Sequence, residues 1–117
     1  MPVEFALFAP GPISVEEQRG IAEVMNPPLV ATQTRDGGTL EFTEFDGTPV
    51  ITLGRARVVE TQADLRRVFR HEVEVPDDTT CWYEGAGPQG SIERGLAVLF
   101  GLAELSGGTP VVKGMQL

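Results

Sequence analysis

A glycine-rich segment is the nearest approach in this sequence to a motif with defined chemistry. Its residues, Gly85-Ala-Gly87-Pro-Gln-Gly90, have the spacing G-x-G-x-x-G, and Ser91 directly after them opens an expected helix. Glycines in that context let the backbone approach a phosphate group at the positive end of a helix. However, Pro88 removes one backbone N–H donor, and the glutamate before the motif would repel an anion. A turn before a helix is therefore the favoured interpretation, and a phosphate site formed by Gly85, Gly87, Gly90 and Ser91 is the alternative.

Arginines gather in one part of the chain and form a second candidate anion site. Residues 55–70 contain five of the nine basic residues, against two carboxylates. Arg55 and Arg57 are two residues apart, so they lie on the same face of an expected strand and could bind an anion together. Arg66, Arg67 and Arg70 share the outer side of an expected helix. Surface arginines usually pair with carboxylates of the same protein, and this interpretation is favoured in so acidic a chain.

An acidic stretch with two aromatic residues is the third candidate, and it points to a protein partner. Between residues 71 and 93 the chain has six carboxylates and no lysine or arginine, and its only tryptophan and only tyrosine lie here. Aromatic rings supply binding energy at interfaces, and carboxylates steer a basic partner. The predicted partner-binding residues are Glu72, Glu74, Asp77, Asp78, Trp82, Tyr83 and Glu84. The alternative is a solvated loop in which one of the two rings points into the core, and the sequence leaves both open.

Groups for catalysis or metal binding are sparse. His71 is the only histidine and Cys81 the only cysteine, and no motif links them. One of each cannot supply the clustered ligands of a zinc site, and no serine lies in a nucleophile-elbow pattern. A lone cysteine in a strand is usually a small buried apolar residue, and adjacent aspartates such as Asp77 and Asp78 are typical turn formers. We therefore expect no catalytic residues, no metal ion and no cofactor.

The composition narrows the class of protein and of partner. The chain has 117 residues, 41% of them hydrophobic, and its 17 acidic and 9 basic residues give a formal charge of -8. A chain of this size and apolar content is expected to form one compact domain, residues 1–117. Its negative charge argues against nucleic acid or an anionic membrane surface as a partner. No signal-peptide pattern and no apolar run of membrane-spanning length are present, so the expected location is cytoplasmic.

Periodicity and turn residues predict elements in the order β-α-β-β-β-α-β-α-β. The strands are expected at residues 3–9, 29–34, 40–45, 49–59, 81–84 and 109–113, and the helices at 15–25, 61–70 and 91–105. Ser14 and Glu17 match a capping box at the start of the first helix. Asp36-Gly37-Gly38 and Asp46-Gly47 mark the turns of a three-stranded meander.

These elements predict the fold class and the core of the last helix. The simplest layered arrangement is an α+β fold, with a single mixed, mostly antiparallel sheet and helices packed mainly on one face. In the last helix the apolar residues are expected to make a broad buried face. They are Ile92, Leu96, Leu99, Phe100 and Ala103.

The last third of the chain carries a resemblance to a known group of proteins. An apolar helix ends in Leu102-Ala-Glu-Leu105, Ser106-Gly107-Gly108 follows, and a short strand comes next. Over about residues 91–117 this pattern resembles the C-terminal part of several small bacterial immunity proteins. The resemblance implies an acidic, single-domain α+β protein that inhibits a cognate toxin, and it transfers no individual functional residue.

The leading hypothesis is a non-enzymatic binding protein of the immunity type, which occludes a basic site of a bacterial toxin. In this hypothesis the acidic stretch steers the toxin, and Trp82 or Tyr83 anchors it. Two alternatives stay open. One is a domain that binds a phosphate-bearing small ligand, or acts as a transferase, through Gly85–Gly90. The other is an accessory subunit of a larger complex. The identity of the partner and the oligomeric state are not decided by the sequence.

Overall fold

The computed structural model describes residues 2–35, 37–59, 63 and 75–113 of the chain. Apart from Ala63, the helix predicted at 61–70 lies outside the described residues. Several residues of the candidate sites also lie outside them: Arg66, Arg67, Arg70, His71, Glu72 and Glu74.

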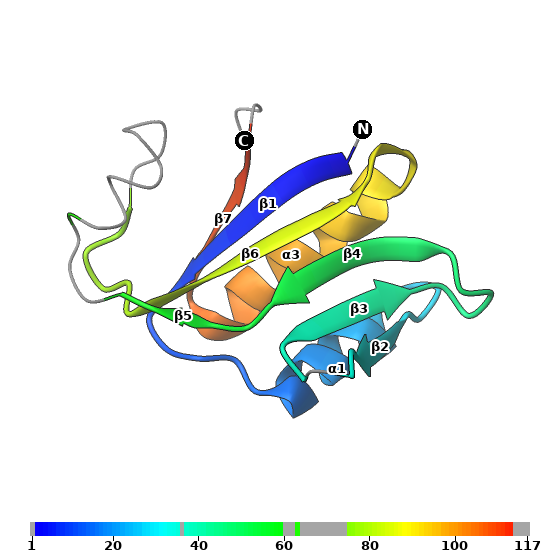
Figure 1. Ribbon diagram of the computed structural model, residues 1–117, viewed down its shortest axis with the longest axis horizontal. Helices are drawn as coiled ribbons and strands as arrows, with labels where there is room; N and C mark the ends of the chain where they lie inside the picture. The colour runs from blue at the N-terminus through cyan, green and yellow to red at the C-terminus, as the bar shows by residue number, and fades with distance from the viewer. Residues whose placement is uncertain (1, 36, 60–62, 64–74, 114–117) are drawn as a thin grey trace.

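Seven strands and two helices make up the described fold (Figure 1). In chain order they are β1 (Pro2–Ala9), α1 (Val15–Val24), β2 (Val30–Gln33), β3 (Thr39–Thr43), β4 (Pro49–Gly54), β5 (Arg57–Val58), β6 (Cys81–Pro88), α3 (Ile92–Ser106) and β7 (Thr109–Val112). The strands form one sheet in the order β2-β3-β4-β6-β1-β7, with β5 also paired to β6. All of these pairs are antiparallel. The predicted α+β fold with a mostly antiparallel sheet is confirmed.

Local signals explain where several elements begin and end. At the start of α1 the Glu17 N–H donates to the Ser14 hydroxyl at 3.1 Å, and the Ser14 N–H donates to the Glu17 carboxylate at 3.2 Å. The predicted capping box is therefore confirmed. α3 ends at Gly107, whose φ of 73° lies in the left-handed region that favours glycine. Gly37 and Gly47 occupy the same region in the two turns of the meander.

Two predicted strands differ in extent from the observed ones. The strand predicted at 49–59 is divided into β4 and β5, because regular strand structure ends at Gly54 and resumes at Arg57. Both parts still pair with β6. The strand predicted at 81–84 continues to Pro88, because it pairs with β1 along its whole length. The hydrogen-bond partners come from a long neighbouring strand, so the local sequence pattern does not predict how far β6 extends.

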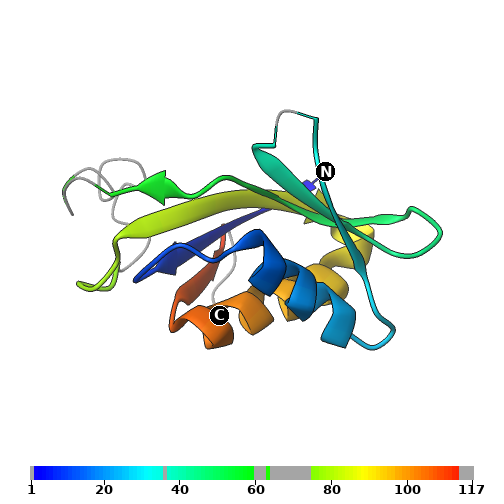
Figure 2. The same cartoon turned by 90° about the horizontal axis from the view of Figure 1, so that it is seen from below.

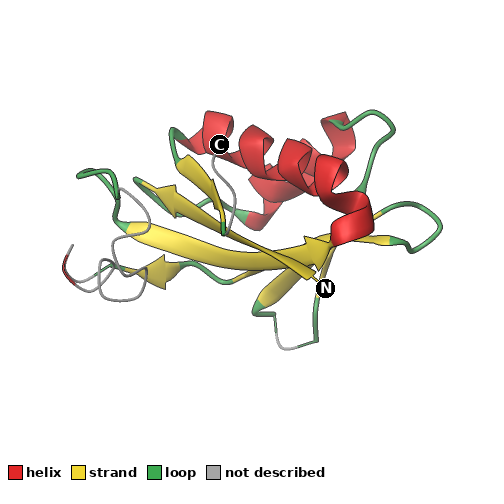
Figure 3. Cartoon of the chain, turned by 90° about the horizontal axis from the view of Figure 1, so that it is seen from above, coloured by secondary structure: helices red, strands yellow, loops and turns green. Residues whose placement is uncertain are grey.

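The two sides of the sheet are covered differently. α1 and α3 lie against one side, which we call the helix side, as Figures 2 and 3 show. Alternation along β1 separates the sides: Phe5 and Leu7 point into the helix-side core, whereas Ala6 and Phe8 point to the second side. The largest helix-side core residues are Phe5, Leu7, Phe42, Ile51, Leu53, Leu99 and Leu102. The apolar cluster on the second side consists of Ala6, Phe8, Val75 and Trp82.

Candidate functional site

The glycine-rich segment is part of the sheet. Gly85 and Gly87 lie in β6, and Gly90 lies in a 3-10 turn, Gln89–Ser91. A Cβ atom added at Gly85 would come within 2.6 Å of the Thr52 carbonyl oxygen, and one at Gly87 within 2.3 Å of the Val50 carbonyl oxygen. The interpretation of Gly85–Gly90 as a loop or turn is therefore wrong for its first four residues. These glycines allow β4 to approach β6 closely.

Ser91 also differs from its predicted role. It occupies the position before α3, but its side chain makes no capping hydrogen bond to the helix. Instead its hydroxyl donates to the Pro49 carbonyl at 3.1 Å and ties the start of α3 to β4. The Ser91 hydroxyl therefore already donates its hydrogen bond within the protein.

The two aromatic residues of the acidic stretch point to opposite sides of the sheet. Tyr83 is 3% exposed in the helix-side core, where its hydroxyl accepts a hydrogen bond from the Ile13 N–H at 2.8 Å. Burial raises the pKa of Tyr83 above its usual value. Trp82 is 6% exposed in the cluster on the second side, and the Arg57 guanidinium lies 5.2 Å from the centre of its ring. Both rings are consequently core residues, and little of either is available to a partner.

Cys81 is a free, buried cysteine beside them. It is 4% exposed, and its thiol donates to the Ala9 carbonyl at 3.8 Å. Burial raises the pKa of this thiol, which keeps it in the unreactive protonated form at neutral pH. The prediction of a small buried apolar residue is confirmed.

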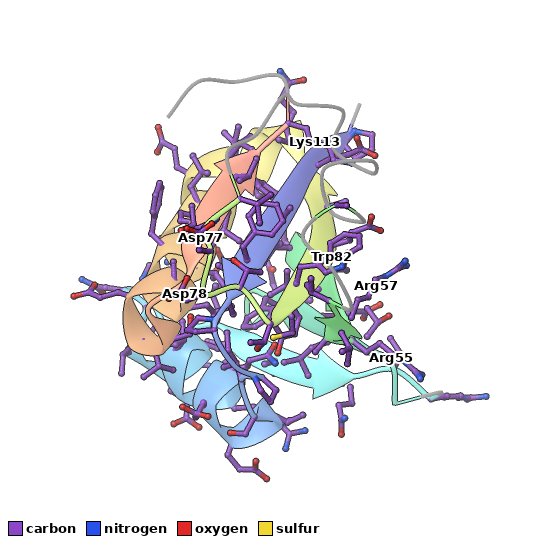
Figure 4. All side chains as sticks on the ribbon, turned by 90° about the vertical axis from the view of Figure 1, so that its left-hand side faces the viewer. Arg55, Arg57, Asp77, Asp78, Trp82 and Lys113 are labelled. Atoms are coloured by element: carbon purple, nitrogen blue, oxygen red, sulfur yellow. The ribbon has the colours of Figure 1, made fainter. Side chains whose placement is uncertain are left out.

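The described carboxylates of the acidic stretch do not form one surface. Asp77 and Asp78 are exposed in a turn, which closes with a hydrogen bond from the Thr79 N–H to the Pro76 carbonyl. Figure 4 places both aspartates toward α3 and β7, away from Arg55 and Arg57. Glu84 instead lies on the second side, in an ion pair with Arg57 at 3.7 Å. The predicted partner-binding set is thus divided between separate places.

The two arginines predicted to share a strand face lie together, although Arg55 falls between β4 and β5 and not in a strand. Arg55 and Arg57 project from the side of the sheet away from the helices (Figure 4). They line one hollow of about 490 Å³, whose other lining residues are Gly38, Thr39, Gly54 and Glu84. Arg57 pairs with a carboxylate, as the favoured interpretation expects. Arg55 makes no hydrogen bond or ion pair within the described part of the chain.

The outer surface of α1 and α3 is a candidate that the sequence reasoning missed. The exposed carboxylates there are Glu16, Glu17, Glu23, Glu93 and Glu104. Three apolar side chains are also exposed: Val24 by 74%, Phe100 by 45% and Leu105 by 48%. Placing Phe100 in the buried face of α3 was wrong, because Val98, Leu99 and Leu102 are the residues that face the sheet.

A signal for this surface was present in the sequence. Glu93, Ala97, Phe100 and Glu104 recur at intervals of four, three and four residues, which places them on one stripe of a helix. All four are exposed. An aromatic residue in a stripe that begins and ends with glutamate indicates a surface rather than a core position, and this distinguishes Phe100 from its apolar neighbours.

The described residues show neither a metal site nor a membrane-spanning helix. Within the described ranges, no three His, Cys, Asp or Glu side chains are grouped so that they could hold a metal ion. No described helix is long and apolar enough to cross a membrane.

A scan of protein-family models, a search of curated proteins and a search of solved structures found no match to this chain.

Proposed function

We propose that this chain is a non-enzymatic binding protein, an inhibitor of the immunity type, which covers a basic site of a toxin with the outer surface of α1 and α3. One observation carries the proposal: this surface combines a concentration of exposed carboxylates with an exposed aromatic ring. The resemblance of the last third of the chain to bacterial immunity proteins supports the same class of function.

The charge of the surface favours a basic partner. The two helices carry five exposed glutamates against two arginines. One of these arginines, Arg94, is already paired with Glu44 at 2.9 Å. The glutamates of α1 and α3 therefore dominate the field that an approaching protein meets. Complementary charge accelerates association and rejects partners of the wrong sign.

The apolar residues give this surface a means of holding a partner. Phe100 is 45% exposed in the stripe of α3 that points away from the sheet. Aromatic side chains are enriched among the few residues that supply most of the binding energy at interfaces, and a polar rim around them excludes water. Glu93 and Glu104 lie in the same stripe on either side of Phe100 and provide such a rim.

The test uses a candidate toxin encoded beside the gene for this chain. The two proteins are co-expressed to measure protection of growth, and titration calorimetry gives the affinity. We expect Phe100→Ala to weaken binding by about 2 kcal/mol or more. Phe45→Ala is the matched control, because Phe45 is 76% exposed but lies in the turn between β3 and β4. The affinity of the Phe45→Ala variant for the toxin should equal that of the unmodified protein.

Charge variants complete the test and separate this surface from the acidic stretch. Glu93→Lys with Glu104→Lys should slow association and reduce its dependence on salt, because charge steering is screened by ions. Asp77→Asn with Asp78→Asn should have a smaller effect. If the aspartate variant abolished binding while Phe100→Ala bound normally, the helix surface would be the wrong one. If none of the variants changed the affinity, the proposed mode of inhibition would be rejected.

A further inference from the structure

We propose that the hollow between Arg55 and Arg57 is a binding site for an oxyanion, a carboxylate or a phosphate group. It lies on the opposite side of the sheet from the surface assigned to the toxin, so it does not depend on that assignment. The hollow of about 490 Å³ is open to a ligand group between the end of β4 and the β2–β3 turn, and Figure 4 shows both arginines projecting from this side.

The Arg55 side chain lies against the backbone of Gly38 and not against a carboxylate. Its guanidinium lies against Gly38 so closely that a Cβ atom added there would be 2.7 Å from Nη2 and 3.2 Å from Nε. Yet Arg55 has no acidic partner among the described residues, in a chain with 17 carboxylates and only 9 basic residues. A guanidinium with unused donors is suited to bind an oxyanion in bidentate geometry.

Arg57 lines the same hollow and contacts an aromatic ring. Its guanidinium stacks over the Trp82 ring at 5.2 Å, a favourable cation–π distance. Its contact with Glu84, at 3.7 Å, is an ion pair but is too long for a hydrogen bond. The donors of Arg57 are thus still available, and two arginines against one glutamate leave the hollow with a positive charge.

The remaining lining residues leave room for an anion. Gly54 has no side chain, so a ligand group can approach the backbone at the end of β4. Thr39 adds a hydroxyl group that can donate a hydrogen bond to an oxyanion. The combination of two guanidinium groups, a hydroxyl and a glycine at the end of β4 is more specific than a general excess of positive charge, which this protein does not have.

The experiment titrates the full-length protein with inorganic phosphate and, separately, with malonate, and follows the arginine side-chain N–H signals by NMR. Saturable shifts of the Arg55 and Arg57 signals are expected with at least one of the two anions. The preferred anion then identifies the natural group as phosphate or carboxylate. Absence of a saturable shift with both anions would overturn the proposal.

Three variants decide whether the site is a positioned one. Arg55→Gln should weaken anion binding about tenfold, because it removes the charged donors. Gly38→Ala keeps every charge but should displace the Arg55 guanidinium, and it should weaken binding by a comparable factor. Gly38 is not among the glycines with a left-handed backbone, so alanine adds no backbone strain there. Thermal melting confirms that each variant is folded.

Arg19→Gln is the control, because it removes the same charge from the helix side. It should leave anion binding unchanged. If Arg19→Gln weakened binding as much as Arg55→Gln, or if Gly38→Ala had no effect, the anion would be responding to overall charge, and the proposed site would be wrong.

Discussion

The two sides of the sheet show how one set of strands can serve stability and recognition at once. On the helix side, large apolar residues such as Phe42 and Leu53 are about 1% exposed and pack with α1 and α3. On the second side, the same strands present threonine, glycine and charged residues, among them Thr52 and Glu84. The period of two in a strand separates these sets, so each side can change without the other.

The ion pairs on the two sides of the sheet differ in length and in exposure. Arg94 and Glu44 meet at 2.9 Å with side chains only 24% and 28% exposed, and Arg94 also donates to the Pro27 carbonyl. This arginine connects α3 to two loops and is structural. Arg57 and Glu84 are 3.7 Å apart and 60% and 42% exposed, a geometry that contributes little to stability. Their charges remain available for binding.

Truncating neighbouring residues of β4 should give the largest contrast. Leu53→Ala removes a helix-side core side chain that is 1% exposed, and we expect a loss of about 2–5 kcal/mol in the free energy of unfolding. Thr52→Ala removes a methyl group and a hydroxyl that donates to the Ala86 carbonyl at 3.2 Å on the second side, and about 0.5–1.5 kcal/mol is expected. Urea denaturation measures both. Equal losses would show that the sides are not distinct.

Adding one methyl group to the glycine segment should have the next largest effect. Gly87→Ala places a Cβ atom against the Val50 carbonyl, and we expect a destabilisation of about 1–3 kcal/mol. Gly90→Ala is the control, because no atom lies within 4 Å of the added Cβ, and its effect should stay within about 0.5 kcal/mol. Thermal unfolding of the two variants measures the difference. If Gly87→Ala were as stable as Gly90→Ala, the close approach of β4 and β6 would be refuted.

Ionisation at high pH should reveal the burial of Tyr83. Of the expected effects, this one changes the stability of the protein near neutral pH the least. Because burial raises its pKa in the folded protein, the stabilisation is fully present below the unfolded value of 10.0 and is lost as the pH rises through the folded pKa. Tyr83 is the only tyrosine, so an absorbance titration reports it alone. The folded protein should ionise at higher pH than the protein in denaturant, and Tyr83→Phe should lack the signal. Identical titrations would show an exposed ring.

Features that depend on a few consecutive residues were predictable. The capping box at Ser14 and Glu17 and the helix end at Gly107 are satisfied within one turn of chain, so their residue types suffice. The meander was predictable for the same reason, since Gly37 and Gly47 set its turns. The candidate sites were not, because each depends on residues far apart in the sequence.

Particular residues show why the sites required the fold. Gly85 and Gly87 match a phosphate-loop pattern. In the structure, however, a side chain at either position would collide with a carbonyl group of β4, which lies more than thirty residues earlier in the chain. Trp82 and Tyr83 were expected in one short strand with one ring pointing into the core, but both are buried because the two sides of the sheet each carry an apolar cluster. Phe100 looked like a core residue because hydrophobicity alone does not say which side of an apolar helix meets the sheet.

The amino-acid sequence by itself determined the acidity, the α+β class, the caps and the turns, because these follow from composition and from interactions within a few residues. The tertiary structure decided which side chains are exposed and which meet. It buried the two rings, divided the acidic stretch and placed Arg55 against Gly38. Strand order and the choice of packing face are cooperative properties of the whole sheet, and no local stretch of sequence encodes them.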